Sequence, residues 1–94
     1  MKLGIRIDKL DNVAMVFEGM IADEILKVGD ESIVAKQIVP QGHKIALVNI
    51  KEGEYIIKYG VPIGRAKCLI SVGEHVHVHN VIDIAGEINA INTI

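Results

Sequence analysis

Short runs of aliphatic residues, separated by glycines and charged residues, follow one another along this chain. The runs that resemble strands cover residues 2–8, 13–17, 32–39, 44–49, 55–59, 65–70 and 75–79. Alternation with a period of two is typical of strands with one buried face, and the abundant Ile and Val suit a pleated sheet. We therefore predict a mainly β fold of compact short strands, with at most short helical turns.

Residues 12–27 form the ambiguous part of this pattern, because a helix competes there with two strands. Gly19 lies inside the window and Val28-Gly29-Asp30 follows it, which favours strand, turn and strand. One helical turn at Met20–Leu26 remains open as the alternative.

A turn pattern recurs three times: an aliphatic residue, two further residues, a glycine, and then a charged or imidazole residue that opens the next strand. The copies are Val39–His43, Ile50–Glu54 and Ile70–Glu74. Glycine adopts a positive φ without steric cost, and we expect each aliphatic residue to anchor its turn in the core. We expect Glu54 and Glu74 to accept backbone hydrogen bonds rather than to act as acids or bases.

The most distinctive stretch is Glu74–Asn80, where three of the four histidines alternate with two valines. In an extended strand the imidazoles of His75, His77 and His79 share one face, and both valines face a core. Cα atoms two residues apart are separated by about 6.5 Å, so neighbouring imidazoles can converge on one metal ion or anionic ligand. A solvated edge strand that is rich in histidine is the alternative.

Composition and charge narrow the classes of protein to which this chain can belong. Half of the 94 residues are hydrophobic but only 3% are aromatic, which favours apolar surface and hence a homo- or hetero-oligomer. The net charge is -2 and the basic residues are scattered, so we expect neither nucleic acid nor a membrane as a partner. The N-terminus shows no signal-peptide core, so a cytoplasmic protein is expected. Cys68 is alone and is expected to be a small buried hydrophobe.

Several motifs in fixed order resemble the small N-terminal domain of altronate and galactarate dehydratases. The resemblance covers about residues 8–82 and rests on Asp11–Ala14, Gly42–Leu47, Gly53-Glu54, Lys58–Gly60, Ile63-Gly64 and Gly73–Asn80. It implies a SAF-type domain with a β-clip fold, and we expect residues 1–94 to form a single domain of this type.

The resemblance also implies a lyase that removes water from a sugar acid with the help of a divalent metal such as iron or manganese. A much larger second domain carries most of the catalytic machinery in that family, and some members are split into two chains. The chain looks like the small subunit of such a two-chain carbon-oxygen lyase, inactive alone and dependent on a large catalytic subunit. The similar small subunit of (2R)-sulfolactate sulfo-lyase, a carbon-sulfur lyase that eliminates sulfite, is an alternative.

Carried over onto matching positions, the resemblance marks the candidate site residues. His43, Lys44 and His77 are the candidate catalytic residues, and His77 with His79 are the candidate metal ligands. Asn80 and His75 are the candidate substrate-binding residues, although relatives can carry an aromatic residue at the position of His75. Purely structural roles remain open as alternatives: His43 can cap its turn, Lys44 can be a solvated strand residue, and Asn80 can end the strand.

Two functions from other classes compete with an accessory lyase subunit. SAF-type domains also occur as free-standing carbohydrate- or anion-binding modules, and a purely structural oligomerisation domain is a further alternative. An adjacent reading frame for a large dehydratase-like chain distinguishes the subunit from the module. The sequence alone does not discriminate between altronate, galactarate and sulfolactate as the substrate.

Overall fold

The structure of the chain, a computed structural model, describes residues 1–86, which contain nine strands. The strands are β1 (Lys2–Ile5), β2 (Val13–Val16), β3 (Ile25–Val28), β4 (Glu31–Val34), β5 (Lys44–Ala46), β6 (Tyr55–Lys58), β7 (Val61–Ala66), β8 (His75–Val76) and β9 (Val81–Ile82). Helical geometry within this part of the chain is confined to Ala85 and Gly86. The prediction of a mainly β fold with short strands is confirmed, and the curled sheets are compatible with a small β-clip.

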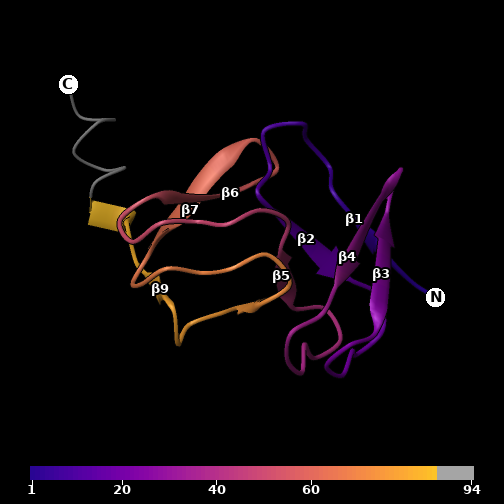
Figure 1. The fold of residues 1–94 in the computed structure, drawn as a ribbon. Coiled ribbons are helices and arrows are strands. Elements are labelled where there is room, and N and C mark those ends of the chain that lie inside the picture. Colours follow the sequence, from indigo (N-terminus) through magenta and orange to yellow (C-terminus); the bar gives the residue numbers. More distant parts are fainter. Residues whose placement is uncertain (87–94) are drawn as a thin grey trace.

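The strands form two sheets. In Figure 1, β1, β3 and β4 of the larger sheet lie at one end of the molecule, its strands β2 and β5 lie in the middle, and the smaller sheet lies at the other end. Six strands pair in the order β4-β3-β1-β2-β5-β8, and three pair in the order β6-β7-β9. Only the β1–β3 pair is parallel among the named strand pairs of residues 1–86. The pairing of β5 with β8 brings together segments that lie about thirty residues apart in the sequence, which a hairpin prediction does not reach.

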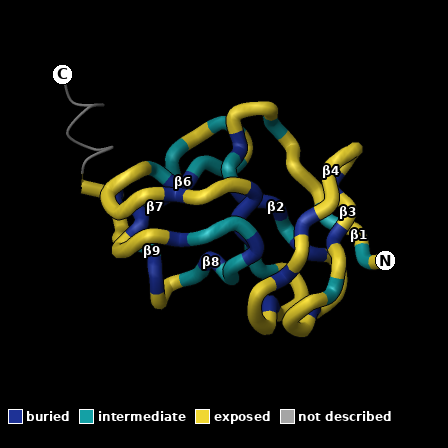
Figure 2. Tube along the Cα trace, viewed as in Figure 1, coloured by how far each residue is buried: buried dark blue, intermediate teal, exposed yellow. Residues whose placement is uncertain are grey.

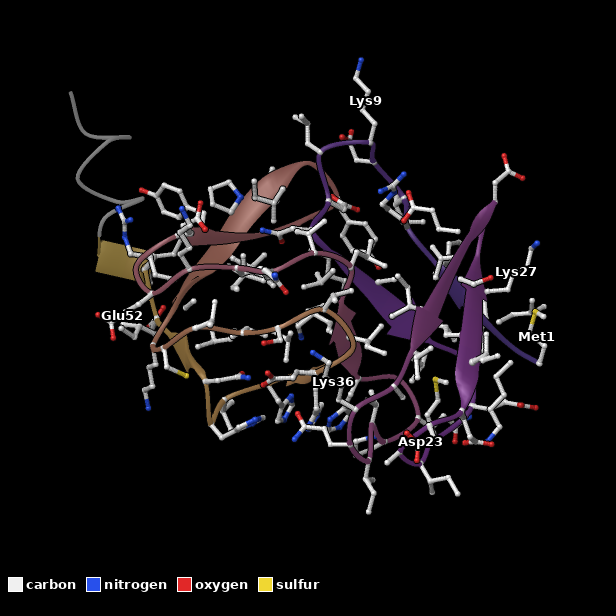
Figure 3. The ribbon with its side chains drawn as sticks, in the orientation of Figure 1. Met1, Lys9, Asp23, Lys27, Lys36 and Glu52 are labelled. Carbon is white, nitrogen blue, oxygen red and sulfur yellow. The ribbon has the colours of Figure 1, made fainter. Side chains whose placement is uncertain are left out.

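Two clusters of aliphatic side chains fill the interior. One lies around Val16, Leu26 and Ile45 in the large sheet, and the other around Ile56 and Ile70 near the small sheet. In Figure 2 the buried segments run along the strands, while the turns at the periphery are exposed. Most charged side chains stay outside, as the outward-pointing Lys9, Lys27 and Glu52 show in Figure 3, and Asp11 is a buried exception.

The predicted turn is confirmed, and it occurs four times in the described residues. Its anchors pair two by two through reciprocal backbone hydrogen bonds, Met20 with Val39 and Ile50 with Ile70. The positive φ is provided by Gly42, Gly53 and Gly73 in three copies, and by Asp23 (φ 74°) in the fourth. Asp23, labelled in Figure 3, was missed by the sequence pattern because only glycine was taken as the signal.

The Asp11-Asn12 pair links the two sheets. The buried Asp11 carboxylate accepts hydrogen bonds from the backbone N–H groups of Gly60 (2.8 Å) and Asp8 (3.0 Å). The side chain of Asn12 pairs with the edge of β6, donating to the Tyr55 carbonyl and accepting from the Ile57 N–H, each at 2.8 Å. These two side chains therefore attach the start of β2 to the β6–β7 hairpin.

The favoured interpretation of residues 12–27 as strand, turn and strand is confirmed by β2 and β3. The alternative helical turn at residues 20–26 is absent, because Met20 forms a bridge and Ile25 already begins β3.

Other predicted boundaries are wrong. β7 runs from Val61 to Ala66, whereas the strand in this part of the chain was predicted at residues 65–70. Cys68 consequently lies in a bend and is exposed, not buried. Within residues 1–86, no helix is long and apolar enough to span a lipid bilayer.

Candidate functional site

His43 occupies a special copy of the repeated turn. In the other three copies the residue at this position is Glu24, Glu54 or Glu74, and its carboxylate accepts the N–H of the residue three positions earlier, at 2.8, 2.6 and 3.0 Å. At His43 the residue three positions earlier is Pro40, which has no N–H to donate. The turn therefore needs no acceptor side chain there, and the imidazole is available for another role.

The histidine-rich stretch does not form the continuous strand that its alternation predicts. β8 ends at Val76, and residues 77–80 form a turn. Val76 is fully buried as predicted, but Val78 is 76% exposed, so the prediction that both valines face the core is wrong for Val78.

Asn80 explains this turn. Its side chain is 5% exposed; the amide oxygen accepts the His77 N–H (3.0 Å), and the amide nitrogen donates to the His75 carbonyl (2.8 Å). These bonds replace ladder hydrogen bonds that a longer strand would need, and they bend the chain back after Val76. Of the two roles open to Asn80, the structure displays the one that ends the strand.

The turn nevertheless brings the imidazoles together. β5 and β8 pair with Lys44 opposite Val76, so one residue further along His43 faces His77, and their ring centroids are 4.1 Å apart. His75 lies beside both, with its Nε2 2.8 Å from the Nδ1 of His43. Nitrogen atoms of His43, His75 and His77 all lie within 4.8 Å of one another. We call these three residues the imidazole cluster.

His79 lies at the edge of the cluster. Its ring centroid is 5.1 Å from that of His75, but the side chain is exposed and contributes no atom to the compact group. The predicted metal pair of His77 and His79 therefore differs from the group that the structure assembles, in which His43 and His75 accompany His77.

The surroundings keep two of the imidazoles neutral. Burial lowers the pKa of His75 to about 4, and the nearby His79, His43, His77 and Lys44 lower it further. Burial also lowers the pKa of His77, assisted by His43 and Lys44. An unprotonated imidazole has a free lone pair, which is the form that binds a metal ion.

The cluster fits a metal ion by donor type and spacing. Two nitrogen ligands of one ion with bonds of about 2.1 Å lie at most about 4.2 Å apart, and the nitrogens of the cluster lie within 4.8 Å of one another. An ion would replace the hydrogen bond between His43 Nδ1 and His75 Nε2. Imidazole donors suit iron better than manganese, which prefers oxygen ligands. The backbone of His75 is held in place by a side chain, since the Gln37 amide oxygen accepts the His75 N–H at 2.8 Å.

Lys44 lies next to the cluster and lines an open pocket with His77, Ile63, Val78, Val81 and Asp83. The pKa of Lys44 is lowered, first by burial and then by the neighbouring Lys58. Sequence reasoning selected Lys44 and His77 but missed Ile63 and Asp83. Ile63 belongs to a motif of the resemblance, but neither it nor Asp83 was placed beside Lys44, since β7 and the residue after β9 reach this pocket only through the tertiary fold.

The chain matches the altronate/galactarate dehydratase SAF domain over residues 2–83. Because this match spans most of the chain, the chain belongs to this family of SAF domains.

Among known proteins, the chain is 49% identical to altronate dehydratase of Bacillus subtilis (strain 168) and 42% identical to altronate dehydratase of Escherichia coli (strain K12). These matches cover 85% and 81% of the chain but only 16% and 15% of the two enzymes. The chain is also 54% identical, over 46 residues, to (2R)-sulfolactate sulfo-lyase subunit alpha of Chromohalobacter salexigens. That match covers 49% of each chain, so the two chains are about equally long.

Proposed function

We propose that this chain is the small accessory subunit of a carbon-oxygen lyase that dehydrates a sugar acid of the altronate or galactarate type. The observation that carries the proposal is the imidazole cluster of His43, His75 and His77 in a domain that belongs to the dehydratase family. The cluster would hold one divalent metal ion, iron in preference to manganese.

Dehydration of a sugar acid begins with loss of the proton beside the carboxylate, which builds negative charge on the carboxylate oxygens. A divalent ion supplies charge neutralisation for such oxygens and polarises the departing hydroxyl. The chain's own residues contribute binding and orientation. The three imidazoles would hold the ion, Asn80 and Gln37 fix the backbone around them, and Lys44 provides a positive charge at the same edge.

A two-chain arrangement is supported by the sulfo-lyase relative, whose name makes it one subunit of its lyase. The altronate dehydratases contain the equivalent of this chain within about one sixth of their sequence, whereas the sulfo-lyase relative is a separate subunit of about this size. Most of the lyase machinery would therefore lie on a large catalytic partner chain. The site is also shallow and open, and the apolar residues Ile63 and Val78 beside it are exposed, which is consistent with closure by a partner.

The sulfo-lyase relationship supports a second candidate function. Subunit alpha of (2R)-sulfolactate sulfo-lyase from Paracoccus pantotrophus is 45% identical over 51 residues, which are 76% of that chain. The same cluster could therefore serve a carbon-sulfur lyase that eliminates sulfite in place of water. The substrate of the assembled enzyme separates the two candidates.

The test combines this chain with a large dehydratase-like chain encoded in the same genome. We expect no turnover by the 94-residue chain alone, and dehydration of altronate or galactarate once both chains are combined with ferrous iron. Release of sulfite from sulfolactate instead would select the second candidate. A large chain that is fully active without the small one would refute the accessory role.

A further inference from the structure

The pocket beside the imidazole cluster has its own chemical character. Its volume is about 280 Å³, and it is open to solvent on one side. His77 belongs both to this pocket and to the cluster, so a molecule in the pocket touches the cluster directly. Five further residues complete the lining: Lys44, Ile63, Val78, Val81 and Asp83.

The Lys44 ammonium is the cation of this pocket, and it has no anionic partner among residues 1–86. The ion pairs of this part of the chain join other residues, Lys2 with Glu24 and Arg6 with Glu31. The neighbouring charge that acts on Lys44 is a second cation, Lys58. A partly buried cation without a counter-charge is unfavourable, and an anion placed in the pocket would relieve that cost.

Asp83 places a hydrogen-bond acceptor, its carboxylate, in the same pocket as the Lys44 ammonium. Its Oδ1 accepts the Ala85 N–H at 2.9 Å, and the carboxylate remains an acceptor for further hydrogen bonds. A carboxylate repels a compact polyanion such as phosphate but accepts hydrogen bonds from hydroxyl groups. Ile63, Val78 and Val81 supply an apolar wall of the kind that packs against the C–H groups of a carbon chain.

We propose that this pocket binds a polyhydroxy acid, with Lys44 taking its carboxylate and Asp83 its hydroxyl groups, and presents it to the imidazole cluster. The proposal rests on the proposed function for its substrate class and goes further by assigning the acid to a subsite on this small chain. Placed this way, the carboxylate lies next to His77, where the charge that develops during dehydration needs to be neutralised.

The test is an amide NMR titration of the 94-residue chain, kept metal-free with EDTA, with galactarate as the probe. We expect saturable shifts at Lys44, His77, Val78 and Asp83. Galactitol, which has the same carbon chain and inner hydroxyl configuration but a CH2OH group in place of each carboxylate, should produce no saturable shifts. Equal binding of galactitol, or no saturable shift with galactarate, would overturn the proposal.

Two lysine variants provide the matched control. Lys44→Met should weaken galactarate binding roughly tenfold or more, since a charge-assisted hydrogen bond is lost. Lys58→Met removes an equal charge close by, from a side chain that lies over the Tyr59 ring rather than in the pocket, and should change binding less than about twofold. Equal weakening in both variants would mean that only net charge matters and would refute the assignment.

Failure of this proposal is distinguishable from failure of the proposed function. Metal binding and turnover by the assembled enzyme, without acid binding at Lys44, would reject the subsite alone. Acid binding at Lys44 without turnover in any assembly would keep the subsite and reject the lyase, leaving an anion-binding module.

Discussion

The turns that end in glutamate and the turn that ends in His43 have one backbone design but different uses. In the turns of Glu54 and Glu74 the carboxylate closes the turn by accepting a backbone N–H group. In the His43 turn Pro40 removes that N–H, and the imidazole joins His75 and His77. At the copy where its local hydrogen bond is dispensable, the repeated turn thus carries a side chain that is available to the imidazole cluster.

The largest expected effect concerns the glycines of these turns. At Gly73 (φ +90°) a Cβ atom would collide with the backbone carbonyl of Val34, whereas at Gly53 (φ +84°) the same space is empty. Gly73→Ala should cost about 3 kcal/mol or more, because overpacking adds to left-handed backbone strain, and Gly53→Ala only about 1 kcal/mol. Urea unfolding of both variants measures the difference. Equal destabilisation would mean that the Gly73 turn is not packed against β4.

The next effect concerns the side chain that shapes the histidine turn. Asn80→Ala leaves the part-buried His77 N–H without its acceptor and should cost about 2 kcal/mol of unfolding free energy. Asn80→Asp keeps an acceptor for the His77 N–H but loses the donor to the His75 carbonyl, and should be intermediate. Chemical denaturation, with amide NMR of the histidine turn, tests this order. A fully stable Asn80→Ala variant would free Asn80 for a direct role with substrate.

The folding stability that depends on the imidazole cluster should also change with pH. The folded pKa of His75, about 4, lies below its unfolded value of about 6.5, so the folded state binds fewer protons between these values. Stability of the metal-free chain should therefore be complete above about pH 6.5 and fall as pH drops towards 4, by about 1 kcal/mol after solvent screening. His75→Gln should remove this part of the pH dependence. An unchanged profile in that variant would assign it to other groups.

The smallest expected effect concerns the residue that ends each repeated turn, which is glutamate in three copies and His43 in the other. Glu74→Ala removes the acceptor of the Ser71 N–H and should cost about 1 kcal/mol or less. His43→Ala removes no turn hydrogen bond and should change the unfolding free energy by less than about 0.5 kcal/mol in the absence of metal. Thermal and urea unfolding of both variants in EDTA provides the comparison. A larger cost for His43→Ala would make that imidazole part of the turn itself.

The fold was predictable where side-chain pattern and turn chemistry agree. Ile- and Val-rich alternation identified most strands, and the turn glycines identified three of the four repeated turns. Asp23 escaped because aspartate at positive φ has no distinctive sequence context here. The strand predicted through His79 was too long, because the buried hydrogen bonds of Asn80 override the alternation of histidine and valine.

The site was predictable in its residue types but not in its grouping. His77 was selected, yet its partners His43 and His75 depend on the register between β5 and β8, which no local pattern encodes. The absent N–H of Pro40 is a signal in the sequence, but it has meaning only once the glutamates of the other turns are known to accept such groups.

The central claim is that His43, His75 and His77 form one metal site while His79 lies outside it. The direct measurement is the ferrous iron bound per chain, with its affinity, at pH 7 under anaerobic conditions for wild type, His43→Ala and His79→Ala. We predict one ion per chain for wild type, a loss of affinity of roughly a hundredfold or more in His43→Ala, and little change in His79→Ala. Full binding by His43→Ala, or its loss in His79→Ala alone, would contradict the account.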